Sequence, residues 1–585
     1  MKKYRFLISI FIISIFSFAC EDASFLDYTP KGSLSEEQLS SPDAVEKLCN
    51  SAYATLAAGQ WRAPYNSKWL WGSVRSDDAY KGGGGTNDQG QWNLAEGYVY
   101  FTPQISTWAD HDKMWTDIYF CIQRVNTALR SLKKLTEDEF PDKTTRMAEM
   151  RFLKGHYYYA LKVLFRHIPY IDEEMTTEEI KETSNRELSD EELWNKIAED
   201  FIYAADNLPA TQPEVGRATK FAAKAYLAKT RLFQAYEQDD QNQLTNINTA
   251  RLEEVVSLTN EVINSGLYDL FDDIRKNFLW DFDNGIESIF SVQYSIDDGT
   301  PMGNVNMEEA LNYNTDSRYG CCSFHQPSQN MVNAFKTDTE TGLPMFDTFN
   351  DVPMINPEDF WTNTVDPRLD HTVGIPTHPF KYDPSFIYTS NPLPVRDPDT
   401  YGPFSPMKSV QHPDCPCKTV AKGYAYDTDS KNKDIIRFDE VLLWKAEALI
   451  QLGRQDEALP IINDIRGRAK NSTEYLKMAD GSPASNYKIE LYIPGNNCDW
   501  TQDFAFKALM WERRLELAME GERLPDLVRW GIAEEVMNKY FDKERQYRVH
   551  LREAKFTKGR DEYLPISQTQ IDLSKGLYVQ NPGYN

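Results

Sequence analysis

The sequence predicts a mainly α-helical protein with a large loop-rich insertion that contains short β-strands. Between Glu440 and Arg468, apolar residues recur at helical spacing on both sides of Gly453, which indicates two helices joined by a short turn. Less regular pairs of the same kind occupy residues 146–165 with 190–208 and residues 217–236 with 252–267. Helix, short turn and helix is the pattern of a tetratricopeptide repeat, and such units need neighbours to bury their apolar faces. We therefore expect a tetratricopeptide-repeat-like helical superhelix.

Two segments interrupt the helical pattern. Residues 268–433 are rich in Pro, Gly, Asn, Asp and aromatic residues, and their clearest strand candidate runs from Ser288 to Tyr294. An aromatic insert covers residues 59–108, before a helix expected around Trp115 to Leu132. Loop-rich segments of this length inside a compact protein are usually functional. The expected division is an N-terminal helical region at 36–267 with the insert 59–108, a loop-rich ligand-binding region at 268–433 and a C-terminal helical region at 434–585.

The N-terminus has the layout of an export signal. Basic residues at positions 2, 3 and 5 precede an apolar run from Phe6 to Phe18, which is shorter than the roughly 20 residues that cross a bilayer. Ala19 stands directly before Cys20, as a lipoprotein processing site requires. We therefore expect residues 1–19 to be a lipoprotein signal peptide, Cys20 to be lipidated and residues 20–35 to form a tether. The alternative is a soluble secreted protein in which Cys20 is incidental.

The composition argues against several kinds of partner. A formal net charge of -26 disfavours nucleic acid and anionic lipid headgroups, because both select for basic surfaces. The chain has eight cysteines, so an odd number is left once Cys20 is lipidated. Cys415-Pro416-Cys417 is one residue closer than zinc-type spacing, and no second pair of ligands accompanies it. We expect isolated thiols or one local disulfide, no metal and no cofactor.

The aromatic insert has the composition of a sugar-binding surface. It holds nine Trp and Tyr rings, interleaved with Arg, Asp, Asn and Gln side chains. A flat ring covers the apolar face of a pyranose, while amides, carboxylates and guanidinium groups hydrogen-bond its hydroxyls. Any single ring packs beneath the loops more often than it binds a ligand, but the cluster as a whole indicates a site. The glycine run from Lys81 to Gly85 lacks the ending of a phosphate-binding loop, and we expect a flexible loop tip there.

The sequence shows no catalytic motif. A glycosidase needs two carboxylates about 5 to 9.5 Å apart across a cleft, whereas Asp77 and Asp78 are neighbours that point apart in an extended chain. A metalloprotease helix motif, a Gly-x-Ser-x-Gly elbow and the context of a Cys/His nucleophile are also missing. We therefore expect no catalytic residues and no enzyme activity.

The C-terminal part of the chain carries a family resemblance. The segment from Glu512 to Gly531 reads ERRLELAMEGERLPDLVRWG, and Tyr563-Leu564-Pro565-Ile566 and Gln580-Asn581-Pro582-Gly583-Tyr584 follow it. In this order and spacing, the segments resemble the C-terminal signature of the SusD/RagB family of outer-membrane nutrient-binding lipoproteins. Segments 151–159, 217–224 and 326–330 are also similar to that family, so the resemblance covers nearly the whole mature chain. We expect the charged residues of the signature, Arg513, Arg514, Glu516 and Glu520, to form an ion-paired, solvated face of a helix that Gly521 ends.

The resemblance implies a function for the chain. It implies a SusD-like cell-surface lipoprotein, anchored in the outer membrane and facing the exterior, that captures oligosaccharide or polysaccharide for a SusC-like TonB-dependent transporter. By position, the resemblance points to a glycan-binding set that comprises Arg75, Asp77, Trp92, Tyr294, Tyr313 and Tyr319. Two alternatives stay open: a RagB-like lipoprotein that captures peptides, and a tetratricopeptide scaffold that binds only protein.

Overall fold

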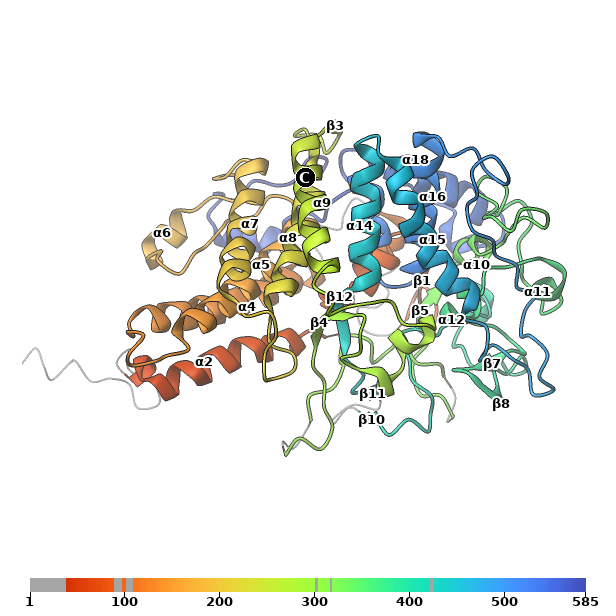
Figure 1. Ribbon diagram of the computed structural model, residues 1–585, viewed down its shortest axis with the longest axis horizontal. Helices are drawn as coiled ribbons and strands as arrows, with labels where there is room; N and C mark the ends of the chain where they lie inside the picture. Colours follow the sequence, from red (N-terminus) through yellow and green to blue (C-terminus); the bar gives the residue numbers. More distant parts are fainter. Residues whose placement is uncertain are drawn as a thin grey trace, which may run out of the picture.

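Long helices dominate both halves of the chain in the computed structural model, which describes residues 38–60, 62–88, 97–101, 109–299, 303–315, 318–420 and 426–584 (Figure 1). The N-terminal half carries α2 (Pro42–Ala54), α4 (Ala109–Lys133), α5 (Lys143–Phe165), α7 (Asp190–Asn207), α8 (Lys220–Ala235) and α9 (Thr249–Ile263). The C-terminal half carries α14 (Phe438–Gln451), α15 (Gln455–Asn471), α16 (Gln502–Glu516), α17 (Arg523–Arg529) and α18 (Ala533–Glu544). Shorter helices are α6 (Thr177–Glu182), α10 (Gln329–Ala334), α11 (Asp359–Thr362), α12 (Arg368–Thr372), α13 (Pro398–Tyr401) and α19 (Gln568–Leu573).

The helix pairs agree with the predicted ones. Helices α5 and α7, α8 and α9, and α14 and α15 correspond to the three pairs expected from the sequence. Along the series α4, α5, α7, α8, α9 and α14, each helix packs against the next, and Figure 1 shows them standing side by side. Local signals set the ends: Ser189 and Glu192 form a capping box at the start of α7, and Gly453 turns the chain between α14 and α15 at φ +74°. The predicted mainly helical, tetratricopeptide-repeat-like fold is confirmed.

Helix α16 ends before the glycine expected to end it. The helix stops at Glu516, and Gly521 lies in the following turn with φ +82°. A Cβ on Gly521 would lie 2.6 Å from the Cβ of Lys68 and 2.9 Å from the carbonyl oxygen of Ser67. Lys68 directly precedes the π-helical turn η4 (Trp69–Ser73) of the aromatic insert. Gly521 is therefore needed for the close approach of the insert as well as for its positive φ.

The charged residues of the C-terminal signature are buried. Arg513, Arg514 and Glu516 are 1%, 4% and 0% exposed, and the side chain of Glu520 is 12% exposed. The Nη2 atom of Arg514 lies 2.9 Å from Asp77 Oδ2 in the insert, and Glu516 Oε2 lies 3.0 Å from Arg368 Nη1 in the loop-rich region. The ion pairing predicted for this helix face is confirmed. The predicted solvation is wrong, because the segments that supply these partners also cover the helix.

Short strands join the loop-rich region to its surroundings. Within the described residues, they form six two-stranded sheets, all antiparallel. The pairs are β1 (Ala79–Gly82) with β5 (Phe324–Pro327), β2 (Tyr236–Gln238) with β3 (Leu244–Ile247), β4 (Ser288–Val292) with β12 (Lys433–Arg437), β6 (Val373–Gly374) with β9 (Ser405–Pro406), β7 (Pro379–Phe380) with β8 (Asp383–Ile387), and β10 (Lys418–Val420) with β11 (Asp427–Asp429). Strand β4 confirms the strand predicted from Ser288. In the β1–β5 pair, Tyr80 lies opposite Gln326, so this sheet fixes the insert against the loop-rich region.

Candidate functional site

Three loops that are far apart in the sequence meet on one surface, which we call the three-loop site. They are residues 83–88, residues 313–315 with 318–323, and residues 386–397. Arg396 donates two hydrogen bonds to the Asp88 carboxylate, at 2.9 and 3.1 Å. The backbone N–H of Thr315 donates to the Pro394 carbonyl at 2.9 Å, and that of Gly83 donates to the Ser323 carbonyl at 2.7 Å. Each loop is thus hydrogen-bonded to another.

The glycine loop is packed rather than a free tip, so the expectation of a flexible tip is corrected. The Lys81 ammonium group donates to the Gly85 carbonyl at 2.9 Å, and the Gly84 N–H donates to Asp88 at 2.7 Å. Gly83 has φ +79°, and a Cβ there would lie 2.6 Å from Asp88 Oδ2 and 2.7 Å from the Phe324 ring. Glycine is required because the loop folds over Asp88 and lies directly on Phe324.

A cluster of aromatic residues lies beneath the site. Its buried members are Tyr313, Tyr319, Phe380, Tyr388, Met407 and Val410, and Phe386 and Leu393 pack against them while remaining partly exposed. The centroid of the Tyr319 ring lies 5.1 Å from that of Phe380 and 5.0 Å from that of Phe386. The exposed Arg318 guanidinium lies 5.2 Å from the Tyr319 ring centroid and 5.8 Å from that of Phe386. The site therefore offers an aromatic surface beside an exposed cation that can donate hydrogen bonds.

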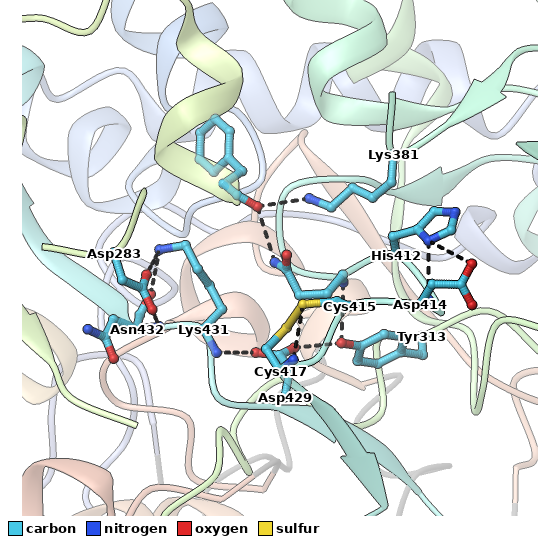
Figure 2. Close-up of a disulfide and its surroundings, with 12 residues drawn as sticks. Asp283, Tyr313, Lys381, His412, Asp414, Cys415, Cys417, Asp429, Lys431 and Asn432 are labelled. Carbon is cyan, nitrogen blue, oxygen red and sulfur yellow. Dashed lines mark hydrogen bonds and ion pairs between the residues drawn. A yellow bond between two sulfur atoms is a disulfide. The ribbon is translucent and has the colours of Figure 1, made fainter. Parts of the chain in front are cut away.

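A polar network holds the floor of this cluster (Figure 2). The Tyr313 hydroxyl donates to Asp429 Oδ2 at 2.6 Å and accepts from the Gln411 N–H at 3.2 Å. Burial raises the pKa of Asp429 to about 6. The Ser430 N–H donates to the carbonyl of Cys417 at 3.0 Å, and Cys417 is disulfide-bonded to Cys415.

The described residues contain two local disulfides, which corrects the expectation of isolated thiols or one disulfide. The second disulfide joins the adjacent Cys321 and Cys322 in the middle loop of the site. The free cysteines of the described chain are Cys49, Cys121 and Cys498. Sequence spacing does not predict these disulfides, because two cysteines this close in a chain can equally remain separate free thiols.

The structure brings two of the predicted binding residues to the three-loop site. Tyr313 and Tyr319 lie in the aromatic cluster, where they are 2% and 1% exposed. Trp92 and Cys20 lie outside the described residues.

The other three predicted residues lie elsewhere in the interior. Tyr294 belongs to the main core and is 9% exposed. Arg75 is 2% exposed and donates to the Asp561 carbonyl at 2.8 Å. Asp77 accepts from the Nε and Nη2 atoms of Arg523, at 2.8 and 3.1 Å. Contact of these residues with a ligand stays a prediction, but the structure already gives Arg75 and Asp77 partners within the fold.

Several residues of the three-loop site were not found from the sequence. Arg318 could have been noticed beside Tyr319, because a cation next to an aromatic residue is a common ligand-binding combination. Phe386 and Arg396 lie in a stretch without motif or periodicity, and the partner of Arg396 is separated from it by 308 positions. Only the tertiary structure reveals that pairing.

The part of the chain that the structure describes shows no cluster of three or more His, Cys, Asp or Glu residues suited to a metal ion. Among its helices, none combines the length and the apolar composition needed to cross a bilayer.

Comparison with known proteins places this chain in a family. Residues 286–584 match the model of the SusD family, and residues 24–232 match a model described as starch-binding associating with outer membrane. The first match covers more than half of the chain, which therefore belongs to the SusD family.

Individual relatives agree with this assignment. A SusD-like protein of Bacteroides ovatus is 28% identical over 284 residues, which span 47% of this chain and 47% of that relative. SusD-like protein P38 of Formosa agariphila is 26% identical over 549 residues, which span 92% of this chain and 94% of the relative. A solved structure described as a laminarin binding SusD-like protein has a TM-score of 0.62 at 20% identity and covers 93% of this chain and 100% of its own. The likeness to that structure is one of fold.

Proposed function

We propose that the chain is a cell-surface glycan-binding lipoprotein that captures an oligosaccharide or polysaccharide at the three-loop site. The observation that carries this proposal is the exposed Arg318 guanidinium beside the Tyr319 and Phe386 rings, where the three loops meet. The partly exposed Phe386 ring stacks on the apolar face of a pyranose, and Arg318 donates hydrogen bonds to its hydroxyls. The laminarin-binding relative of the same fold supports this class of ligand.

The ligand set combines residues of the site with those predicted by position. Phe386 and Arg318 contact the glycan directly, and Tyr319 holds both of them in place from below. Trp92 adds a further ring from the segment that follows Asp88. The proposal includes no bond-breaking step: the Asp88 carboxylate already accepts two hydrogen bonds from Arg396 and one from the Gly84 N–H, so it is engaged within the fold.

The same proposal includes the cellular setting. Lipidated Cys20 anchors the chain in the outer membrane facing the exterior, in agreement with the outer-membrane association of the second matching model. The captured glycan then passes to a SusC-like TonB-dependent transporter, and the affinity is modest enough for release.

Substitution at the three-loop site tests the proposal. Calorimetry measures how a protein that lacks residues 1–20 binds plant, microbial and host polysaccharides and a peptide mixture. We expect Phe386→Ala and Arg318→Ala each to weaken binding of the recognised glycan about tenfold, because each removes a contact at the centre of the surface. Phe120→Ala is the matched control, since Phe120 on α4 is 49% exposed and Arg124 lies over its ring at 4.7 Å.

Two results would contradict the proposal. Unchanged glycan binding by both variants would place the ligand elsewhere on the chain. Binding of peptides alone would assign the chain to the RagB-like class. As a control, far-ultraviolet circular dichroism of each variant checks that the fold is kept.

A further inference from the structure

A groove, which we call the lysine groove, lies beyond the end of α15 and has a volume of about 400 Å³. It shares no residue with the three-loop site. Its apolar floor includes Leu476 and Ile489, both 4% exposed, and its sides carry Lys470, Lys477, Lys488 and Glu490. Ligand pockets of proteins commonly measure about 300 to 1,000 Å³, so this groove has the size of a ligand site.

The groove has an excess of positive charge on a strongly acidic chain. Lys470 Nζ pairs with Glu490 Oε2 at 2.6 Å, which cancels one charge of each sign. Lys488 Nζ donates to the carbonyl oxygens of Thr339 and Glu340, and its charge also acts on the Asp338 carboxylate. Within the described residues, the ammonium group of Lys477 has no hydrogen-bond or ion-pair partner. The lining thus holds three lysines and one glutamate on a chain with a net charge of -26, so the groove is a locally basic surface that favours an anion.

An exposed aromatic ring lies in the same turn as the groove. Tyr475 is 42% exposed, and its neighbours Leu476 and Lys477 line the groove. The Arg275 guanidinium lies 3.5 Å from the centroid of the Tyr475 ring, and Arg275 Nε lies 3.2 Å from Asp273 Oδ2. Arg275 thus covers part of the ring and restricts its orientation. The rest of the ring remains accessible to a ligand.

We infer that the lysine groove and Tyr475 form a second binding site, which takes an anionic saccharide. The exposed surface of the Tyr475 ring stacks on a pyranose, and Lys477 and Lys488 bind the carboxylate or sulfate group of the sugar. Carboxylate and sulfate share the chemistry that these ammonium groups recognise. The site extends the proposed glycan capture to a second class of ligand but does not depend on the three-loop site.

Matched pairs of polysaccharides test this inference. Affinity electrophoresis measures binding by the protein that lacks residues 1–20. One pair of gels contains polygalacturonate or its methyl ester, and the other contains dextran sulfate or dextran. We expect retardation by at least one anionic polymer, little retardation by its neutral partner, and weaker retardation as salt is added, because salt screens the lysine charges. A response to polygalacturonate alone assigns a carboxylate site, and one to dextran sulfate alone assigns a sulfate site.

Two variants locate the binding. We expect Lys477→Gln and Tyr475→Ala each to weaken binding of the anionic polymer about fivefold to tenfold. Lys181→Gln is the matched control, because Lys181 on α6 is 68% exposed and lies outside the groove. Both test residues are exposed, so thermal unfolding should be close to that of the parent chain.

The outcomes separate this inference from the proposed function. Phe386→Ala should leave binding of the anionic polymer unchanged, while Lys477→Gln should leave unchanged the binding of a neutral glycan at the three-loop site. The inference is overturned if the parent chain binds neither anionic polymer, or if Lys477→Gln and Tyr475→Ala bind it as tightly as the parent. Loss of binding in Lys181→Gln to the same extent as in Lys477→Gln would also overturn it, since general charge would then explain the result.

Discussion

At the scale of single residues, Asp77 separates a structural role from a ligand-binding role. Asp77 is 2% exposed, and its carboxylate pairs with Arg514 and Arg523 of the C-terminal signature. We expect Asp77→Asn to lower the free energy of unfolding by about 3 kcal/mol, because it leaves two buried guanidinium groups with too little negative charge. If Asp77 acts only through these ion pairs, glycan binding per folded molecule should not change. Chemical denaturation and calorimetry measure the two quantities.

The control for this prediction is a paired carboxylate at the surface. Asp43 pairs with Lys47, and its side chain is 81% exposed. We expect Asp43→Asn to change the free energy of unfolding by less than about 0.5 kcal/mol. Loss of glycan binding by Asp77→Asn at full stability would instead make Asp77 a ligand contact.

Residue-level prediction from the sequence is limited where a side chain depends on tertiary partners. The family resemblance pointed by position to Tyr313 and Tyr319, which lie together in one cluster. The density of rings pointed instead to the insert, whose described rings Tyr65, Trp69, Trp71, Tyr80 and Tyr98 are at most 2% exposed. For Arg514, helical spacing predicted ion pairs but not burial, because Asp77 comes from a segment 437 positions away. Arg318 stands beside Tyr319 in the sequence, but its second ring neighbour, Phe386, comes from another loop.

At the scale of secondary-structure elements, Gly521 shows how two elements come into contact. It joins α16 to α17 at φ +82°, and a Cβ there would meet Lys68 and Ser67 at less than 3 Å. We expect Gly521→Ala to lower the free energy of unfolding by more than about 2 kcal/mol, because the strained φ and the displaced insert both add to the cost. Gly453→Ala is the matched control. Its φ is +74°, but its Cβ would meet open space, so we expect a loss of about 1 kcal/mol.

Equal losses in both variants, measured by chemical denaturation, would contradict the packing part of this argument. The backbone conformation alone would then explain the cost.

Secondary-structure elements could be predicted when their backbone hydrogen bonds lie within the element, as in a helix. Helices α14 and α15 could be read from the sequence, since apolar periodicity and a turn glycine define a helix pair locally. Among the short strands, only β4 was predicted. Strands such as β1 and β5 are four residues long and pair across more than 240 positions, so no local pattern announces them. Strands β1 and β5 flank two loops of the three-loop site, which is why the sequence did not predict how those loops meet.

At the scale of the whole molecule, buried charge ties the parts of the chain together. Glu522 Oε1 lies 2.5 Å from Lys68 Nζ in the insert and 3.1 Å from Lys229 Nζ on α8. Although burial opposes it, the nearby Lys229 and Lys68 hold the pKa of Glu522 well below its usual range. The residues of the family signature therefore hold the two helical halves and the insert together. They carry little information about the ligand, which in the proposed function contacts other loops.

Buried titratable groups also determine how stability depends on pH. Burial lowers the pKa of His156, His325 and His550 to about 3 and raises that of Glu308, Glu544 and Glu562 to about 7. Because of these histidines, the free energy of unfolding falls as pH drops below about 6.5, since the unfolded chain then binds protons that the folded chain does not. Because of these glutamates, the free energy of unfolding falls as pH rises from about 4.3 to 7, since the folded chain then holds more protons than the unfolded chain. The two effects oppose each other between those values.

We therefore expect a broad plateau of thermal stability from about pH 5 to 7 and a steep loss below about pH 4.3. In that acid range the raised glutamates no longer contribute, while the histidines continue to favour the unfolded state. Paired carboxylates add to the loss: although burial opposes it, Arg437 and Lys408 hold the pKa of Glu520 at about 2. Calorimetric unfolding from pH 3 to 8 measures the profile. His550→Gln should flatten the acid limb by about 1.4 kcal/mol per pH unit, which is the uptake of one proton, and an unchanged limb would show that His550 is not buried in its neutral form.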